Sequence, residues 1–595
     1  MARLDPHSCF DDTQPITRSI HWTATVDFGA KRLAGAATLQ LAAPAAAGPL
    51  DLDSKGLTIR GVRTGDGREI AWELGPEDAI QGRRLRLALP AGTERVVLNY
   101  EAAPDAVALQ WLEPQQTAGK RHPFLFSQCQ AIHARTILPC QDSPRVRISY
   151  TAEVTVPEPL VAVMSAGSSG SRPGPAPGTR TFTFEMPQPI PSYLLALAVG
   201  NLAAKDVHPR CRVWAEPEVV EAAAYEFGEV GTMLERAEAL FGPYEWDRYD
   251  MLVLPPSFPY GGMENPRLTF LTPTLLAGDR SLVDVVTHEL AHSWTGNLVT
   301  NATMDHFWLN EGFTVWAERR ILEALHGEDA AAVAWAIGQK GMEGAFARFG
   351  MDSPFTRLRT DLTGVDPDDA YSQIPYEKGA RFVVLLERHA GRERFERFIR
   401  RYIERFRFQS ITTEEFLAFL EEELPGAAAA VGSQEWLYET GLPENAPAFR
   451  SATLERLVQA AAGWGGGMRP DPVHAARWPA AHLLVYLQNL PRPLPAADCA
   501  WLDGELSLTG RGNYEILVEW LAIATASDYE PVFPRLREVL TTVGRMKYLR
   551  PLYGALGTSA RTRALGRAIF EDAKDGYHPL SRRVVESVME SWPAD

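Results

Sequence analysis

The first 200 residues alternate hydrophobic and polar positions in short runs. The segments GAATLQL (35–41), RVVLNYEA (95–102) and ISYTAEVTV (148–156) switch between the two classes at most steps, and clusters of Gly, Pro and Asp separate such runs. A period of two is typical of strands that bury one face. We therefore predict a mostly antiparallel β domain over residues 1–203, with the Gly- and Pro-rich stretch 167–178 as a long exposed hairpin loop rather than an interdomain linker.

Beyond residue 203 the spacing of the hydrophobic residues becomes helical. Residues 204–442 contain every residue that we expect to handle a metal, so this region is the predicted catalytic domain. Residues 443–452 are predicted to be a linker, because Pro and turn formers gather there. In residues 453–595, apolar positions such as Val532 and Leu536 share one helix face, which predicts an all-α domain. The chain is too long for one hydrophobic core, and we expect a multidomain α+β protein.

Charge and cysteine content exclude several classes of function. The net charge of −16 and the lack of a dense Lys or Arg run argue against a nucleic-acid partner. The five cysteines are widely spaced and form no CxxC pair, so neither a disulfide framework nor a thiolate zinc site is indicated. No apolar run approaches the ~20 residues that span a bilayer, and the N-terminus has no signal-peptide pattern. We expect a cytoplasmic monomer that binds no membrane.

The segment from Ser281 to His292 contains a candidate metal site. Ser281 and Asp284 have the spacing of a capping box, which predicts that a helix starts at Ser281. His288 and His292 are four residues apart, so one helix face presents both imidazoles to a single ion. Glu289 is placed to activate a water there. A lone HExxH also occurs by chance on surface helices, so the motif by itself leaves that alternative open.

A second predicted helix supplies a third ligand. Asn310 is a candidate N-cap, and Glu311 then lies in the first turn with its carboxylate near the histidines. Two histidines and one carboxylate leave a coordination position open, as in catalytic zinc sites, so we predict one Zn²⁺ per chain. Glu318 lies two turns after Glu311 and could hydrogen-bond a ligand imidazole. Its alternative role is a solvated charge beside Arg319 and Arg320.

These motifs resemble those of one enzyme family, the gluzincin aminopeptidases of the leukotriene A4 hydrolase and aminopeptidase B group. The resemblance extends over nearly the whole chain, and it implies an N-terminal β saddle, a thermolysin-like mixed α/β catalytic domain and an all-α C-terminal helical stack. Its motifs are FSQCQAIHARTILPCQD (126–142), SFPYGGMENP (257–266), HELAH (288–292), WLNEGF (308–313), DPDDAYSQIPYEKG (366–379) and GRMKYLRPLY (544–553).

The resemblance implies roles around the substrate's amino terminus. Glu264 matches the carboxylate that binds the free α-amino group, which would make the enzyme an exopeptidase. Gln128 and Gln130 match glutamines that hold the amino terminus and the first side chain. Tyr376 matches the tyrosine that donates to the oxyanion, and Tyr371 matches a second pocket tyrosine. The remaining expected peptide-binding positions in this region are Tyr260, Gly261, Gly262 and Met263.

Further matches concern the two ends of the substrate. Arg545 and Lys547 resemble the cationic pair that receives the C-terminal carboxylate of a short peptide. Asp368 could place an anion in the first-residue pocket and favour N-terminal Arg or Lys, although the adjacent Asp369 leaves this ambiguous. The hypothesis is a zinc-dependent aminopeptidase that trims short peptides with a free N-terminus, with Glu289 as the general base.

Two other functions stay open at this stage. The first is a bifunctional enzyme that also opens leukotriene-type epoxides, since Asp368, Tyr371 and the cationic pair match positions tied to that chemistry. Met304 stands where the leukotriene hydrolases have a tryptophan, which counts against a lipid pocket. The second is a catalytically silent, zinc-stabilised scaffold. The presence of the water activator, the amine anchor and the oxyanion tyrosine argues against it.

Overall fold

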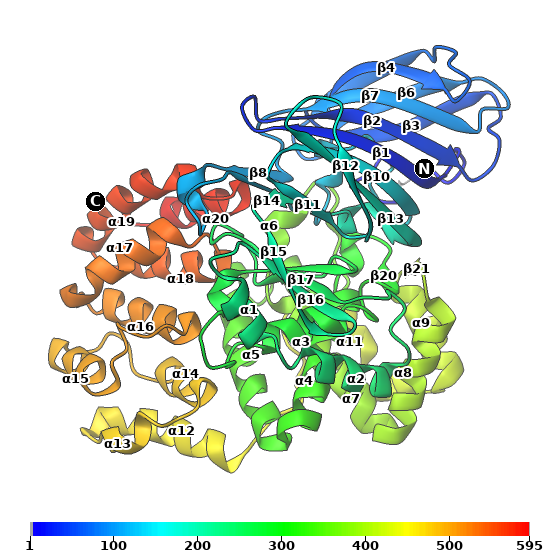
Figure 1. The fold of residues 1–595 in the computed structure, drawn as a ribbon. Coiled ribbons are helices and arrows are strands. Elements are labelled where there is room, and N and C mark those ends of the chain that lie inside the picture. Colours follow the sequence, from blue (N-terminus) through cyan, green and yellow to red (C-terminus); the bar gives the residue numbers. More distant parts are fainter. Residues whose placement is uncertain (1–3, 594–595) are drawn as a thin grey trace.

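The computed structural model describes residues 4–593 and has three parts along the chain. Figure 1 shows the β-rich N-terminal part in blue and cyan, the mixed central part in green and the helical C-terminal part in orange and red. The three parts lie against one another rather than in a row. The predicted α+β architecture with an all-α C-terminal part is confirmed.

The largest N-terminal sheet has seven strands, and its sequence explains its one buried face. Strand β1 (Thr17–Asp27) alternates buried and accessible residues along its length, as the period of two predicts. The stretch 167–178 is a hairpin, but part of it is itself a strand, β12, so the loop is shorter than predicted. The strand order is β12 (Gly167–Pro173), β13 (Thr179–Pro191), β10 (Arg147–Pro157), β1, β2 (Arg32–Leu41), β7 (Arg95–Ala102) and β4 (Thr58–Thr64).

Two smaller sheets complete the N-terminal part. Only one of them, the four-stranded sheet, approaches the candidate site, because Gln128 and Gln130 directly follow its strand β9. Both glutamines therefore lie just beyond a strand and not within one. The four strands are β11 (Val161–Met164), β14 (Leu197–Gly200), β9 (Phe124–Ser127) and β8 (Leu109–Leu112), and the three-stranded sheet contains β3 (Gly48–Ser54), β6 (Gly82–Leu89) and β5 (Trp72–Asp78).

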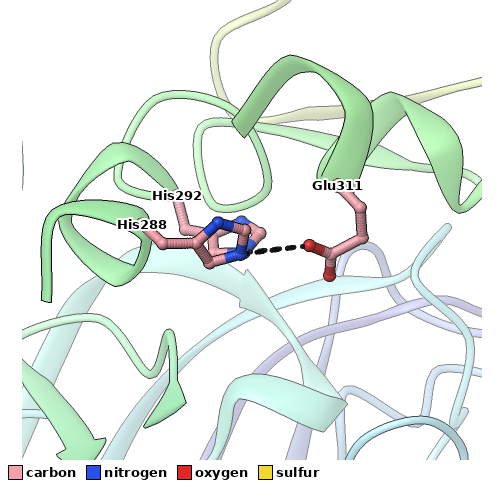
Figure 2. A group of neighbouring side chains, drawn as sticks. All are labelled: His288, His292 and Glu311. Carbon is pink, nitrogen blue, oxygen red and sulfur yellow. Dashed lines mark hydrogen bonds and ion pairs between the residues drawn. The ribbon is translucent and has the colours of Figure 1, made fainter. Parts of the chain in front are cut away.

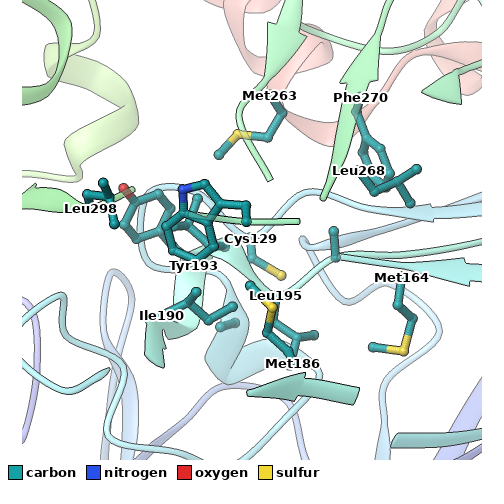
Figure 3. Packing of buried hydrophobic residues seen from close by; sticks show 14 of the residues in the cluster. Cys129, Met164, Met186, Ile190, Tyr193, Leu195, Met263, Leu268, Phe270 and Leu298 are labelled. Atoms are coloured by element: carbon teal, nitrogen blue, oxygen red, sulfur yellow. The ribbon is translucent and has the colours of Figure 1, made fainter. Parts of the chain in front are cut away.

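The central part opens with a five-stranded sheet that shares its core with the N-terminal part. Figure 3 shows Met164, Met186 and Tyr193 packed close to Met263 and Phe270. This continuous apolar packing fixes the strand that leads to Glu264 against the N-terminal sheets. The strands are β15 (Ala203–His208), β16 (Cys211–Ala215), β17 (Asp250–Val253), β19 (Leu268–Leu271) and β18 (Gly262–Met263), and β20 (Val299–Asn301) pairs with β21 (Gln409–Ile411).

Helices α3 and α4 present the candidate ligands and pack against each other. Helices α2, α5 and α7 pack against this pair, and α4 is buried along most of its length. The helices of the central part are α1 (Val220–Glu226), α2 (Val230–Phe241), α3 (Asp284–Ala291), α4 (Trp308–His326), α5 (Glu328–Phe349), α6 (Pro367–Ala370), α7 (Gly379–Ala390), α8 (Arg392–Phe406), α9 (Thr413–Glu423), α10 (Ala427–Ala430) and α11 (Ser433–Tyr438).

Both predicted helix caps are wrong. Helix α3 starts at Asp284 rather than Ser281, whose hydroxyl instead accepts a hydrogen bond from Asn513 Nδ2 at 2.8 Å. Asn310 lies inside the first turn of α4, where its Oδ1 accepts from the backbone N–H of Asn301 at 3.0 Å. In both cases a partner that is distant in sequence or lies outside the helix binds the side chain that would otherwise have capped it.

The C-terminal helices form a second hydrophobic core of their own. Val532 and Leu536 are fully buried in it, as the helical stripe predicts. The end of this part touches the N-terminal part, where the ring of His578 stacks on Phe126 at 6.0 Å. Within residues 4–593, no helix combines the length and apolar character needed to cross a membrane. The helices are α12 (Ala452–Ala462), α13 (Pro472–Ala475), α14 (Ala480–Gln488), α15 (Ala496–Leu506), α16 (Tyr514–Ala526), α17 (Phe533–Thr542), α18 (Met546–Leu556), α19 (Ala560–Ala573) and α20 (Pro579–Glu590).

Candidate active site

Three side chains from two helices converge at the centre of the molecule. His288 and His292 come from the end of α3, and Glu311 reaches them from the first turn of α4 (Figure 2). The Nε2 atoms of the two histidines are 3.2 Å apart, and Glu311 Oε2 lies 3.3 and 3.4 Å from them. The i, i+4 spacing and the packing of α3 on α4 thus place three donor atoms around one point.

The three donor atoms fit a zinc ion. Zn–N and Zn–O bonds of about 2.0–2.1 Å in a tetrahedron place neighbouring ligand atoms about 3.3–3.4 Å apart, which matches the observed triangle. Glu311 Oε2 is buried and accepts no hydrogen bond within the described chain. A buried carboxylate oxygen without a donor is costly, and a cation at the centre of the triangle would satisfy it.

A surrounding set of hydrogen bonds orients both imidazoles. Glu318 Oε2 lies 3.1 Å from His288 Nδ1, on the side away from the triangle. His292 Nδ1 lies 2.9 Å from the carbonyl oxygen of Thr295 and 3.1 Å from Thr314 Oγ1. These partners leave each Nε2 free to bind a metal, as in other histidine-ligated sites. The Thr295 contact depends on the loop after α3 and the Thr314 contact on the packing of α4, so neither has a signature in the local sequence.

Glu289 is buried beside the triangle. Burial raises the pKa of its carboxyl to about 8, although the nearby histidines act in the opposite direction. Its carboxylate lies against residues 260–263, here called the Gly-rich loop, since a Cβ atom on Gly262 would come within 2.4 Å of Glu289 Oε1. The glycine therefore leaves the room that the Glu289 side chain occupies.

Glu264 lies next to both Glu289 and His292. One carboxylate oxygen of Glu264, one of Glu289 and a ring nitrogen of His292 all lie within 4.8 Å of one another. Gln130 Nε2 donates to Glu264 Oε1 at 3.3 Å, and no Lys or Arg of the described chain forms an ion pair with this carboxylate. Burial raises the pKa of Glu264. The Glu264 carboxylate therefore lies next to the metal triangle without a Lys or Arg partner in the described chain.

Tyr376 packs against His288, one of the three candidate ligands. Its ring stacks on His288 with centroids 5.9 Å apart, and its hydroxyl donates to the Tyr371 hydroxyl at 3.3 Å. Tyr376 belongs to a single turn of π-helix, Ile374–Lys378, and such turns are frequent at functional sites. Burial raises the pKa of Tyr376 well above its ordinary value, so the phenol remains a proton donor.

Gln128 and Met263 are both buried and contact each other. Gln128 is almost fully buried, and its Nε2 contacts the Met263 sulfur at 3.2 Å. A cavity between the central and N-terminal parts is lined by Gln130, Tyr260 and Tyr371, with neither Gln128 nor Met263 in its wall. The structure therefore places Gln128 where it can support the Gly-rich loop through Met263.

The predicted cationic pair comes from the C-terminal part and shares one carboxylate. Arg545 Nη1 lies 3.3 Å from Glu515 Oε1, and Lys547 Nζ lies 2.8 Å from Glu515 Oε2. Arg545 also reaches the Gly-rich loop, since a Cβ atom on Gly261 would come within 2.6 Å of its Nη2. Two cations against one carboxylate leave a net positive charge at this end of the loop.

Asp368 lines the cavity but already has two partners. Its Oδ2 lies 2.9 Å from His133 Nε2 and 2.7 Å from Arg583 Nη2. Asp369 is exposed and is not part of the cavity wall. The roles of Glu515, His133 and Arg583 are not apparent from the sequence, because each pairs with a residue far away in the chain. His133 stands in the motif 126–142, but the motif does not indicate its partner.

Comparisons with known proteins agree across all three parts of the chain. Residues 16–194 match the Peptidase M1 N-terminal domain, residues 225–436 the Peptidase family M1 domain and residues 478–589 the C-terminal domain of leukotriene A4 hydrolase. The domain boundaries predicted at 203, 442 and 452 lie between these matches and stay predictions.

Similar proteins cover nearly the full length. Leukotriene A-4 hydrolase of Xenopus laevis is 38% identical over 602 residues, which is 98% of each chain. Leucine aminopeptidase 2 of Yarrowia lipolytica is 38% identical over 94% of this chain and 89% of its own. The solved structure of yeast LTA4 hydrolase in complex with bestatin has a TM-score of 0.90 at 31% identity, covering 98% of this chain and 97% of its own. The chain therefore belongs to peptidase family M1 and is a zinc aminopeptidase of the leukotriene A4 hydrolase type, with one catalytic zinc ion.

Proposed function

We propose that the site removes the first residue from short peptides, with Glu264 as the anchor for the free α-amino group. The observation that supports this role is the buried Glu264 carboxylate within 4.8 Å of Glu289 and His292 and without a Lys or Arg partner in the described chain. An N-terminal ammonium bound there would have its first peptide bond beside the metal triangle. Charge-assisted hydrogen bonds of this kind are about twice as strong as neutral ones.

Glu289 and Tyr376 are the proposed catalytic groups. His288, His292 and Glu311 would hold the zinc ion, which would supply Lewis acidity to the first peptide carbonyl and to the attacking water. Glu289 takes a proton from that water and later delivers it to the leaving amine. Tyr376 donates a hydrogen bond to the oxygen on which negative charge develops.

The far end of the substrate is assigned to Arg545 and Lys547. Their excess of positive charge over Glu515 suits a peptide C-terminal carboxylate, and Arg545 lies against the same Gly-rich loop as Glu289. The backbone at Tyr260, Gly261 and Gly262 is the proposed track between the two ends. A cleft with an anion at one end and cations at the other favours peptides of a few residues.

The amine anchor can be tested with matched peptides. We expect wild type to hydrolyse free tripeptides and to leave their N-acetylated forms intact. Glu264→Gln should lower kcat/KM for the free peptide about 10–100-fold, because a hydrogen bond to a charged group contributes about 1.5–3 kcal/mol. The metal content should stay at one zinc per chain. Hydrolysis of the acetylated peptide at a comparable rate would show that Glu264 is not an amine anchor.

Epoxide opening is a second candidate function. The relative named leukotriene A-4 hydrolase and the largely apolar cavity beside the metal site favour it. Against it stands Asp368, which is held by His133 and Arg583 and is not free to act on a lipid. Incubation of the pure enzyme with the epoxide, followed by analysis of the diols, tests this activity.

The remaining assignments follow from sequence alone. We propose that the protein acts in the cytoplasm as a monomer and binds neither nucleic acid nor membrane. Net negative charge, scattered cysteines and the absence of long apolar runs support these assignments. Light scattering of the purified enzyme tests the oligomeric state.

A further inference from the structure

We propose that Arg583 sets the first-residue specificity by neutralising Asp368, so that the pocket takes uncharged side chains and rejects Arg and Lys. This inference rests on the proposed aminopeptidase function and concerns the substrate class of the same site. It is opposite to the preference that the sequence suggested for Asp368.

The cavity lies where the first side chain of a bound peptide would go. Gln130, in its wall, donates to the proposed amine anchor Glu264. Phe307, also in its wall, packs edge-on against Tyr376 with centroids 6.1 Å apart. The cavity thus adjoins both the amine anchor and the oxyanion tyrosine. A side chain on the residue held by Glu264 would point into it.

Among the described residues that line the cavity, Asp368 is the one carboxylate, and three parts of the molecule meet around it. His133 comes from the N-terminal part, Asp366 and Asp368 flank the start of α6, and Arg583 reaches over from α20. Arg583 bridges both carboxylates, with Nη1 3.1 Å from Asp366 Oδ2 and Nη2 2.7 Å from Asp368 Oδ2.

The two partners of Asp368 remove its attraction for a substrate cation. Burial alone would raise the pKa of Asp368, but the charges and hydrogen bonds of His133 and Arg583 outweigh it and lower that pKa. Both partners bind the same oxygen, Oδ2. Their positive charge offsets that of the carboxylate as a whole, so its other oxygen attracts an incoming Arg or Lys only weakly, and Arg583 repels that cation. A buried charge without a full counter-ion is costly.

The rest of the cavity wall also disfavours a cation. Arg357 contributes a guanidinium to the wall, and its Nε is buried without a hydrogen bond in the described chain. The other side chains are mostly apolar and include Met304, Phe307, Phe355, Leu358 and Leu362. An aliphatic or aromatic first residue would bury apolar surface against them, which favours its binding.

Arg583 can be replaced without disturbing a core. Its side chain is 45% exposed, whereas the Asp368 side chain is 14% exposed. Arg582, next to it on α20, is similarly exposed and pairs with Glu586 at 2.9 Å on its own helix. Arg582→Gln is therefore a matched control that removes one guanidinium from the same helix and leaves Asp368 untouched.

The test compares kcat/KM for leucine and arginine amides in each variant, because their ratio does not depend on the fraction of active enzyme. Wild type should favour the leucine amide at least tenfold. Arg583→Gln should raise the arginine-to-leucine ratio about tenfold, Arg583→Lys should stay near wild type, and Arg582→Gln should leave the ratio unchanged. Adding Asp368→Asn to Arg583→Gln should cancel the gain, since the two residues are in contact.

The outcomes separate this inference from the function on which it rests. If zinc-loaded wild type hydrolyses neither amide, the proposed aminopeptidase function fails. If wild type prefers the arginine amide, or Arg583→Gln leaves the ratio within twofold of wild type, the role of Arg583 fails while the aminopeptidase stands. A gain that persists in the double variant would show that Arg583 acts without Asp368.

Discussion

The carboxylates at the metal site and those around Asp368 are buried in neighbouring parts of the molecule, but they differ in their partners. Within residues 4–593, Glu264, Glu289 and Glu311 form no ion pair with any Lys or Arg, and Glu311 Oε2 accepts no hydrogen bond. Asp368 has both Arg583 and His133 on one oxygen. The first group has no cationic partner from the protein, whereas Asp368 has two.

This difference separates ligand-binding charge from internal charge. Burying a carboxylate without a partner is costly, so a fold retains such groups where a metal or substrate provides the missing charge. The Asp368 cluster instead resembles an ordinary interdomain ion pair. A motif match cannot tell the two apart, because Asp368 and Glu264 are equally acidic in the sequence.

Glu289→Gln should have the largest effect among the changes considered for the metal site. The amide keeps the shape and hydrogen-bonding capacity of the side chain but cannot accept the proton from water. We expect kcat to fall by about 10²–10⁴-fold, the usual contribution of a general base. Zinc should remain bound, because His288, His292 and Glu311 are intact. Metal analysis measures the bound zinc, and hydrolysis of a tripeptide measures kcat. A variant that loses its zinc would contradict the assignment of Glu289 as a general base that is not a metal ligand.

Tyr376→Phe should have the next largest effect. The ring would still stack on His288, so the site should keep its shape and its zinc. Loss of one aimed hydrogen-bond donor costs about 2.7–4 kcal/mol in the transition state, or 10²–10³ in kcat. KM should change little. Tyr371→Phe is the comparison variant, because that hydroxyl accepts the Tyr376 hydrogen bond, and full activity of Tyr376→Phe would exclude the oxyanion role.

Local geometry explains which features could be predicted from the sequence. The positions of His288, His292 and Glu318 depend only on helical spacing within α3 and α4. The predicted caps at Ser281 and Asn310 are wrong because Asn513 and Asn301 bind those side chains instead. Side-chain competition of this kind depends on tertiary contacts and leaves no mark on the local sequence.

Long-range pairing explains what could not be predicted. Arg583 and Asp368 are 215 positions apart, and Glu515 lies 30 positions before Arg545 on another helix. Family resemblance indicated Asp368 and Arg545 but not the residues that neutralise them. The charge of a pocket depends on all the residues around it, so it could be assigned only from the three-dimensional structure.

Glu515→Gln should have the smallest effect, and it tests the intermediate case, in which one carboxylate is shared by two cations. Burial alone would raise the pKa of Glu515, but Lys547 and Arg545 outweigh it and lower that pKa to about 2. Because the folded-state pKa lies below the ordinary value, this carboxylate stabilises the fold above pH ~4.5, and the contribution is lost as the pH falls toward ~2. Since Lys547 is largely exposed, we expect the ion pair to contribute only about 1–2 kcal/mol to the free energy of unfolding at pH 7. Calorimetry should show that the Tm of Glu515→Gln is a few degrees below that of wild type at pH 7. This difference in Tm should shrink between pH 5 and pH 3. A constant difference over that range would show that the ion pair with Arg545 and Lys547 does not stabilise the fold.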